Sequence, residues 1–458
     1  MQNFEFIAKQ KSYFLSGKTR SISKRIEMLE KLNSSIVKNE LKIFESLKKD
    51  LNKSNFESYL TEIAILKSEI KLIKKKLKNW SKPKRIKSTL ANFPSKDYLF
   101  QEPYGITLII SPWNYPFQLA LLPLISSISA GNTAVLKPSE HSPYTSKLIE
   151  EIILDIFPED YVKVVLGDSE IATKLLELRW DYIFFTGSVR VGKIVAKAAS
   201  KYLTPLTLEL GGKNPCIVDK NTDIKLTAKR LVWGKFVNAG QTCIAPDYLI
   251  VEKSIKNNLV KQLIVEIEKA YGKDQEKSGD YPRIINEQNL KNLASLIENQ
   301  EILYGGHYDL KNKYFSPTII NNPGLNSSIM SEEIFGPILP VLEYEKTEDI
   351  FKLIYRFEKP LALYVFTKNS KFSDEIINKV SFGGGVINDT MIQFGNHRLP
   401  FGGVGESGMG SYHGESGYKL FSHQKPIIKK ANWLDIPTRY APYSGKLSSL
   451  KKLLRFLT

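Results

Sequence analysis

Thr107-Leu108-Ile109-Ile110-Ser111 is a short apolar run bounded by polar residues and turn signals. Two similar runs follow it, at residues 133–137 and 162–166. Segments of helical character, one ending at Ala130 and one covering residues 143–156, separate the three runs. Buried strands that alternate with helices are typical of a parallel sheet. The sequence therefore predicts a doubly wound α/β domain built around residues 107–111.

The remainder of the chain divides on either side of this region. Residues 3–80 carry apolar side chains at helical spacing, and residues 81–100 form a break rich in Pro, Lys and Ser that we expect to bridge two parts of the molecule. A second alternating region begins near Leu206. Its expected strands are residues 216–218, 248–251 and 361–367. At ~100–200 residues per domain, a chain of 458 residues has room for two or three domains.

The composition is that of an ordinary globular protein, with 42% hydrophobic and 25% charged residues. Only two cysteines occur, which fits a reducing cytosol. The first residues lack an apolar core behind a basic head, so we expect no secretory signal and a cytoplasmic location. The net charge of +17 comes mostly from lysines spread along the chain, without an RNA-binding motif. We therefore expect a solvated basic surface and no nucleic-acid partner.

A thiol and a carboxylate each lie in a segment marked by glycine. Cys243 ends Gly240-Gln241-Thr242-Cys243, and Glu209 begins Glu209-Leu210-Gly211-Gly212-Lys213. A thiol is mostly protonated at neutral pH, so a nearby base such as Glu209 must activate it. If the thiol adds to an aldehyde, the oxyanion needs fixed donors, the departing hydride needs a nicotinamide acceptor, and the thioester needs a base for hydrolysis. Cys216, inside an apolar segment, is expected to be an inert packing residue.

An apolar strand expected at residues 183–186 runs into a turn at Gly187 and Ser188, before a helix that opens near Gly192. A glycine between a strand end and a helix N-terminus suits the approach of a pyrophosphate. The spacing is not the G-x-G-x-x-G pattern of dinucleotide-binding turns, so this signal is weak by itself.

Seven motifs in a fixed order resemble the aldehyde dehydrogenase superfamily, and the likeness covers nearly the whole chain. They are Ser111-Pro112-Trp113-Asn114-Tyr115-Pro116, Gly131-Asn132-Thr133 with Leu136-Lys137-Pro138-Ser139-Glu140, Phe185-Thr186-Gly187-Ser188, Glu209-Leu210-Gly211-Gly212-Lys213, Gly240-Gln241-Thr242-Cys243, Glu332-Glu333-Ile334-Phe335-Gly336-Pro337, and Pro400-Phe401-Gly402-Gly403. The first motif and the continuation after Cys243 look most like the class 3 group, which acts on medium- and long-chain aliphatic or aromatic aldehydes.

The resemblance implies an α/β fold with a Rossmann-type NAD(P)-binding domain, an α/β catalytic domain and a small bridging or oligomerisation element. The expected boundaries are 1–80, 101–205 and part of 393–420 for the first, 206–392 for the second, and 81–100 with 421–458 for the third. A homodimer formed through the bridging element is the expected assembly.

The resemblance also implies a role for each matching residue. Cys243 looks like the nucleophile, Asn114 with the Cys243 backbone N–H like the oxyanion hole, and Glu209 like the general base. The expected cofactor contacts are Lys137 and Glu140 at the adenosine ribose, Trp113, Gly187 and Ser188 at the pyrophosphate, and Glu333 and Phe335 at the nicotinamide and its ribose. A carboxylate at Glu140 would repel a 2′-phosphate, so NAD is favoured and NADP remains possible. Tyr115, Phe236 and Phe394 are candidates for an apolar substrate funnel, although an ordinary core role fits each as well.

Two other functions are compatible with parts of the sequence. One is a dehydrogenase that passes the acyl group to CoA, although that group usually lacks the carboxylate at Glu209. The other is a basic scaffold for RNA or acidic lipid, which leaves the seven motifs unexplained. The histidines show no metal-ligand spacing, so no metal is expected. They are His141, His307, His397, His413 and His423.

The C-terminal tail, residues 446–458, has leucines at helical spacing and basic residues between them. They are Leu447, Leu450, Leu453, Leu454 and Leu457, with Lys446, Lys451, Lys452 and Arg455. Such a helix packs against protein, here as a dimer contact, or lies weakly on the inner face of an anionic membrane. Both interpretations stand.

Overall fold

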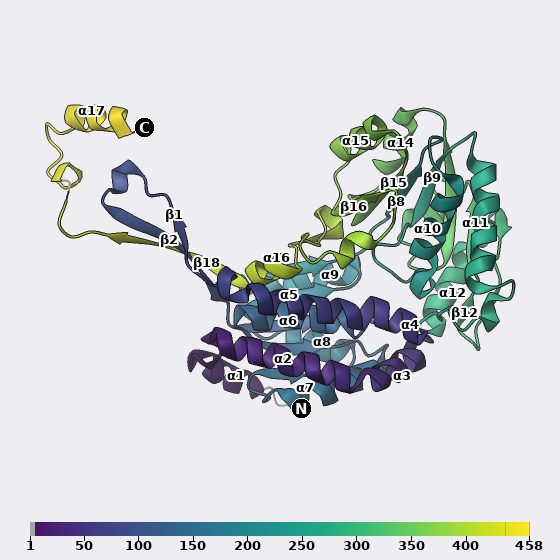
Figure 1. Ribbon diagram of the computed structural model, residues 1–458, viewed down its shortest axis with the longest axis horizontal. Coiled ribbons are helices and arrows are strands. Elements are labelled where there is room, and N and C mark those ends of the chain that lie inside the picture. Colours follow the sequence, from purple (N-terminus) through teal and green to yellow (C-terminus); the bar gives the residue numbers. More distant parts are fainter. Residues whose placement is uncertain (1–4, 436, 458) are drawn as a thin grey trace.

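Two lobes and a projecting arm make up the molecule, with the chain ending at the far end of the arm (Figure 1). The computed structural model describes residues 5–435 and 437–457. The first lobe contains a six-stranded sheet in the order β17-β7-β6-β3-β4-β5. Its strands are β3 (Ile106–Ile110), β4 (Thr133–Lys137), β5 (Val162–Val164), β6 (Tyr182–Thr186), β7 (Leu206–Glu209) and β17 (Gly408–Met409). All of them are parallel except β17, as the alternating pattern predicted.

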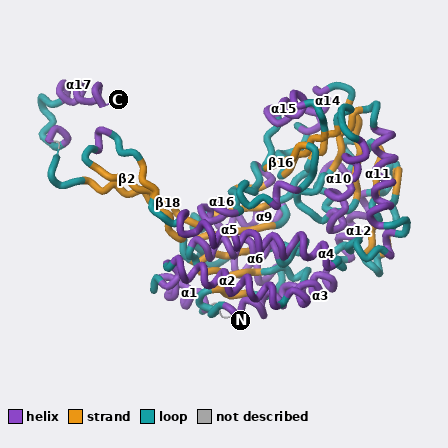
Figure 2. The backbone as a smooth tube through the Cα atoms, viewed as in Figure 1, coloured by secondary structure: helices purple, strands orange, loops and turns teal. Residues whose placement is uncertain are grey.

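Helices cover both faces of the first sheet (Figure 2). Those between the strands are α6 (Gln118–Ala130), α7 (Pro143–Ile156), α8 (Ser169–Leu176) and α9 (Val189–Ser200). The N-terminal layer contains α1 (Phe6–Leu15), α2 (Ile22–Lys38), α3 (Glu40–Leu51), α4 (Asn55–Ser58), a π-helical turn (Tyr59–Ile63) and α5 (Ala64–Trp80). Every residue of α6 is buried because this helix packs on β3 and β4 and is covered in turn by α2, α5 and α16 (Gly414–Leu420). The site-bearing strand β3 therefore rests on a rigid, two-layered support.

The second lobe is built on a seven-stranded sheet in the order β10-β13-β14-β9-β8-β15-β16, parallel except for β10. Its strands are β8 (Pro215–Val218), β9 (Tyr248–Glu252), β10 (Ile302–Tyr304), β13 (Thr318–Asn321), β14 (Ile338–Tyr344), β15 (Ala362–Phe366) and β16 (Gly384–Ile387). A hairpin, β11 (Tyr308–Asp309) and β12 (Tyr314–Phe315), lies beside it. The covering helices are α10 (Ile224–Phe236), α11 (Lys256–Tyr271), α12 (Glu287–Leu296), α13 (Ser328–Ser331), α14 (Thr347–Ile354) and α15 (Ser370–Lys379).

One expected boundary differs from the observed sheets. Residues 206–209 were expected to open the second alternating region, yet β7 pairs with β6 in the first sheet. Glu209 therefore lies on the first sheet, and the second sheet starts at Pro215. Both strands are short and apolar, so their composition does not tell which sheet either one joins.

The arm is a three-stranded antiparallel sheet in the order β1-β2-β18, formed by Lys84–Ile86, Ser95–Pro103 and Ser422–Lys430. Helix α17 (Leu447–Leu457) follows at its tip, where the tail pattern predicted a helix. The side chains of Leu453, Leu454 and Leu457 lie outside the described residues. Among the described residues, none of the helices has both the length and the apolar character needed to cross a bilayer.

Candidate active site

The predicted site residues lie where the two sheets face each other. Asn114 follows β3, Lys137 ends β4, Gly187 follows β6 and Glu209 ends β7, so all four are at the carboxyl edge of the first sheet. The sheet order reverses between β3 and β6, and ligands of open α/β sheets bind at such a point. From the second lobe, the loops that precede the amino ends of its parallel strands lead to this region. They carry Asn214 before β8, Cys243 before β9, and Glu333 with Phe335 before β14.

Glu209 is a buried carboxylate with only 3% of its surface exposed. Neither of its side-chain oxygens has a hydrogen-bond partner among the described residues. Burial holds its pKa well above the ordinary value for a glutamate. A buried acid that lacks partners is costly and is commonly kept for a ligand, a water or a proton. Glu209 is therefore suited to exchange protons with a molecule that enters the site.

Cys243 lies in the turn between α10 and β9. The chain reaches it through Asn238, Ala239 and Gly240, all with positive φ. A Cβ on Gly240 would lie 2.3 Å from the carbonyl oxygen of Gly336, so glycine is required for this close approach. The amide of Asn214 donates to the Cys243 carbonyl oxygen at 2.8 Å, which fixes the turn.

Burial raises the pKa of Cys243, and the carboxylates of Glu333 and Glu209 raise it further. The backbone N–H groups of Cys243 and Ile244 act in the opposite direction on this pKa. The thiol is thus protonated at rest, with two carboxylates and two backbone N–H groups near enough to affect its pKa. Cys216 lies fully buried on β8, as expected of a packing residue.

Asn114 is joined directly to the cysteine turn. Its Nδ2 donates to the carbonyl oxygen of Gln241 at 3.0 Å, and the neighbouring Tyr115 hydroxyl lies 2.6 Å from Oγ1 of Thr242. An asparagine amide has two hydrogens, so one remains for a ligand. The fold therefore brings the predicted amide donor beside the turn of Cys243.

Glu333 is held from both sides by main-chain contacts of its loop. The ammonium group of Lys213 donates to the carbonyl oxygen of Glu332 at 2.9 Å and pairs with Asp247 at 2.6 Å, while Asp247 accepts from the N–H of Ile334 at 3.0 Å. Burial raises the pKa of Glu333 to about 8, with a further rise from Asp247. Lys213 and Asp247 were not predicted as site residues, and the only signal for Lys213 was its place in the Glu209 motif.

The predicted cofactor residues lie along the same carboxyl edge. Lys137 Nζ is 2.7 Å from Oε2 of Glu140, and the lysine is buried. Burial alone would raise the pKa of Glu140, but the hydrogen bond from Lys137, a backbone hydrogen bond and the charges of Lys137 and His141 together outweigh it, and the pKa is lowered. Ser188 caps α9, whose N-terminus is exposed, and a ring of Trp113 meets Phe335 edge-on at 5.4 Å. A buried ammonium and a helix N-terminus supply hydrogen-bond donors, and two aromatic rings supply flat apolar surface. Together these groups fit a dinucleotide.

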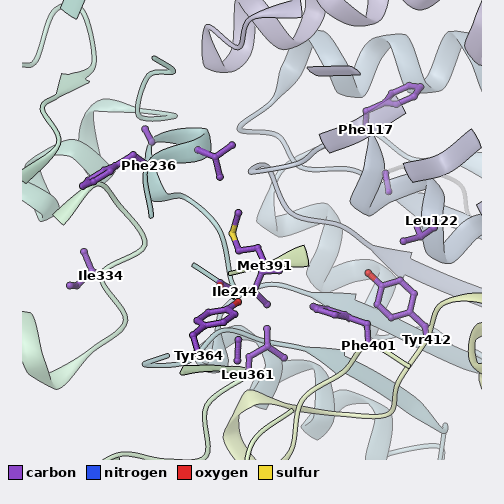
Figure 3. Packing of buried hydrophobic residues seen from close by; sticks show 14 of the residues in the cluster. Phe117, Leu122, Phe236, Ile244, Ile334, Leu361, Tyr364, Met391, Phe401 and Tyr412 are labelled. Atoms are coloured by element: carbon purple, nitrogen blue, oxygen red, sulfur yellow. Dashed lines mark hydrogen bonds between the residues drawn. The ribbon is translucent and has the colours of Figure 1, made fainter. Parts of the chain in front are cut away.

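The three candidates for a substrate funnel lie in different surroundings. Phe236 is fully buried and points away from the central cluster of Ile244, Tyr364 and Met391 (Figure 3), so its place is in the core. Tyr115 is buried at the cysteine turn. Phe394 is half-buried and packs on Phe401 at 4.8 Å and on His413 at 4.7 Å.

Tyr412 is a further aromatic residue at the site that sequence reasoning missed. Burial raises the pKa of Tyr412, and Glu209 and Cys243 raise it further, so its hydroxyl belongs to the same electrostatic environment. No motif in the sequence pointed to it. It lies beside Phe401 (Figure 3).

Known proteins of one family resemble the chain along its whole length. Residues 5–427 match the family described as "Aldehyde dehydrogenase family". The 4,4'-diaponeurosporen-aldehyde dehydrogenase of Staphylococcus aureus is 45% identical over 97% of each chain. The dimeric, NADP-preferring aldehyde dehydrogenase of Canis lupus familiaris is 40% identical over 97% of this chain and 98% of its own. A solved structure, the substrate-bound state of Staphylococcus aureus AldH, is 44% identical, covers 99% of this chain and 100% of its own, and superposes with a TM-score of 0.96.

The chain therefore belongs to the aldehyde dehydrogenase family. Several relatives at 41 to 44% identity carry family 3 names, which agrees with the class 3 resemblance of the sequence. The protein is an NAD(P)-dependent aldehyde dehydrogenase that oxidises aldehydes to carboxylic acids. The predicted α/β fold, with two largely parallel sheets and a small antiparallel element, is confirmed. A non-enzymatic basic scaffold is set aside by this membership.

Proposed function

We propose that Cys243 is the nucleophile, Asn114 the oxyanion donor and Glu209 the general base of this oxidation. The observation that carries the proposal is the unpartnered, buried carboxylate of Glu209, which contributes to the raised pKa of Cys243. A general base must lie within reach of the group whose proton it takes. The other carboxylate near the thiol is Glu333, and its loop is fixed by contacts to the backbone of Glu332 and Ile334. Glu209 is therefore the candidate for the base.

In the first step the sulfur of Cys243 bonds to the aldehyde carbon as its proton passes to Glu209. The raised pKa of Cys243 keeps the thiol protonated at rest. The raised pKa of Glu209 makes its carboxylate, once ionised, a stronger base than an ordinary glutamate. The aldehyde oxygen becomes an oxyanion, which the free hydrogen of the Asn114 amide and the Cys243 N–H stabilise. The product of this step is a thiohemiacetal on Cys243.

A nicotinamide held by the proposed contacts would supply the acceptor for the hydride that leaves the thiohemiacetal carbon. The C–H electron pair departs with that hydride, the carbonyl re-forms, and a thioester remains on Cys243. Glu209, after losing its proton to solvent, accepts a proton from water as the water oxygen bonds to the acyl carbon. The C–S bond then breaks, the acid leaves and the thiol is restored. Hydrolysis in place of transfer to CoA is supported by the carboxylate at Glu209.

The proposed cofactor contacts are Lys137 and Glu140 at the adenosine ribose, Trp113, Gly187 and Ser188 at the pyrophosphate, and Glu333 and Phe335 at the nicotinamide side. Glu140 supports a preference for NAD because its carboxylate would repel a 2′-phosphate. Lys137 beside it is a cation that a 2′-phosphate could also use. One relative, 40% identical, is named as NADP-preferring.

We propose that the substrate is an apolar aldehyde, with a medium or long aliphatic chain or an aromatic group. Three aromatic residues support this class: Tyr115, which contacts Thr242 beside Cys243, Tyr412, whose pKa is raised in part by Cys243, and Phe394 in the neighbouring aromatic cluster. The relative at 45% identity is named as a 4,4'-diaponeurosporen-aldehyde dehydrogenase. A homodimer in the cytoplasm is the proposed assembly, supported by the exposed apolar side chains of the arm and by a dimeric relative.

Purified protein mixed with NAD and a medium-chain aldehyde tests the roles at Cys243. We expect reduced nicotinamide to form with the wild type and to fall by about 10³-fold or more with Cys243→Ala. Cys216→Ala is the matched control, because it removes the other thiol, which is fully buried on β8. Undiminished turnover in Cys243→Ala would sink the proposal.

A further inference from the structure

Lys53 and Glu62 form an ion pair that the proposed mechanism does not use. Lys53 Nζ lies 2.6 Å from Oε1 of Glu62, and both side chains are 0% exposed. Burying two charges costs several kcal/mol per ion, and a pair is tolerated only where further hydrogen bonds complete it. Glu62 lies in the π-helical turn Tyr59–Ile63, a distortion that is frequent at functional sites. The location of the pair thus calls for an explanation.

Both partners use their remaining hydrogen-bonding capacity on one loop. Lys53 Nζ donates to the carbonyl oxygen of Asn114 at 3.1 Å and lies 4.1 Å from the centre of the Tyr115 ring. The second oxygen of Glu62 accepts from the N–H groups of Phe117 at 2.9 Å and Gln118 at 3.2 Å. The pair therefore holds the loop between β3 and α6 in its middle and at its α6 end.

A second chain of contacts connects this loop to the cysteine turn. The carbonyl oxygen of Asn114 also accepts from Nδ2 of Asn238 at 2.8 Å, and Asn238 donates its backbone N–H to Oε1 of the buried Glu57 at 3.0 Å. Asn238 Nδ2 lies 3.1 Å from the carbonyl oxygen of Gln241, which accepts from the Asn114 amide as well. The backbone of Asn114 is thus fixed by an ammonium on one side and an amide on the other.

We infer that the Lys53–Glu62 pair is a positioning device that holds Asn114 in register with Cys243, so that its amide meets the oxyanion. This inference rests on the proposed oxyanion role of Asn114. An ammonium on the Asn114 carbonyl also keeps the loop from moving as charge develops. A misplacement of about 1 Å at such a donor costs up to roughly 10²-fold in rate.

Stability and rate separate positioning from mere support of the fold. Lys53→Met and Glu62→Gln each leave a buried charge unpaired, so each is expected to lower Tm. The double variant K53M/E62Q removes both charges and is expected to regain most of Tm while kcat stays about 10-fold or more below wild type, with the KM for NAD unchanged. Lys53→Arg keeps the charge, so its kcat is expected to lie between those of Lys53→Met and the wild type. If the double variant does not fold, Lys53→Arg allows the same comparison of kcat with Tm. The matched control is Arg25→Met, a buried cation bonded to main-chain carbonyls far from the site, which should lower Tm and leave kcat unchanged.

Combination with Asn114→Ala completes the test. Without the Asn114 amide its position no longer matters, so K53M/E62Q/N114A and Asn114→Ala are expected to share one kcat, about 10²-fold or more below wild type. Multiplying effects, or a K53M/E62Q variant whose kcat recovers together with its Tm, would overturn the inference. A wild-type kcat in Asn114→Ala would instead reject the proposed oxyanion role. A wild-type kcat in K53M/E62Q together with a reduced kcat in Asn114→Ala would reject only the positioning role of the pair.

Discussion

The carboxylate of Glu333 lies directly against the α-carbon of Gly211. A Cβ on Gly211 would be 1.9 Å from Oε2 of Glu333, and the N–H of Gly212 hydrogen-bonds the same carboxylate. Gly211→Ala must therefore displace Glu333, which we propose grips the nicotinamide ribose. We expect a KM for NAD raised by about 10-fold or more and a lower kcat, measured by steady-state kinetics at saturating aldehyde.

Gly279→Ala is the matched control for this prediction, since no heavy atom lies within 4 Å of a Cβ built there. It should leave both constants as in the wild type. An unchanged KM for NAD in Gly211→Ala would mean that Glu333 does not contact the cofactor.

The dependence of kcat on pH should report Glu209. Burial raises its pKa, so the carboxyl keeps its proton to a higher pH than an ordinary glutamate, and in the protonated form it cannot accept a proton from water. Raising the pH ionises it, so a kcat that is limited by hydrolysis is expected to climb with pH, at a higher pH than an ordinary glutamate would give. Glu209→Gln should lose this rise, reduce kcat by about 10²–10⁴-fold, and let an acyl adduct accumulate on Cys243, visible by intact-protein mass spectrometry.

The exposed Glu287, which pairs with Lys291 at 2.6 Å, offers a control carboxylate. Glu287→Gln should keep the pH profile of the wild type. If Glu209→Gln kept it too, the base would have to be sought elsewhere.

The strands and the chemistry of the site could be foreseen more fully than the contacts that organise it. The apolar runs at β3 and β4 are read directly from the sequence, because buried parallel strands are continuous stretches of such residues. The sheet that β7 joins is decided by long-range pairing with β6, which a local pattern does not contain.

The Lys53–Glu62 pair shows the same limit at the level of side chains. A lysine and a glutamate in a lysine-rich helical region have the composition of a solvated face. Their burial follows from the π-helical turn and from the packing of the loop after β3, which only the assembled lobe creates. Tyr412 was missed for the same reason, since its nearness to Glu209 depends on β17 joining the first sheet.

Glu140 should control the choice between NAD and NADP. Its carboxylate, partly exposed and bonded to Lys137, opposes a 2′-phosphate. Glu140→Gln removes the charge and frees the ammonium group, so the ratio of kcat/KM for NADP to that for NAD should rise by about 10-fold, on the order of 1.4 kcal/mol. Glu159→Gln, which breaks a comparable pair with Lys163 on the surface, should leave the ratio unchanged. A constant ratio in both variants would place the ribose away from Glu140.

The tail helix α17 either binds an anionic membrane or packs against a second copy of the chain, and shortening the chain distinguishes the two. Leu447 is 62% exposed, Lys451 and Lys452 are exposed, and residues 446–458 contain no acidic side chain. A basic helix of this kind is attracted to anionic lipid by about 1 kcal/mol per cation near the surface. If it binds membrane, the full chain should float with anionic vesicles at low salt, and the chain shortened by residues 446–458 should not, while both sediment as dimers. If the helix instead packs against a second copy, shortening should weaken the dimer in analytical ultracentrifugation, and neither form should float. Phosphatidylcholine vesicles, which carry no net charge, are the control for the first outcome, because flotation with them would point to apolar adsorption and not to the lysines.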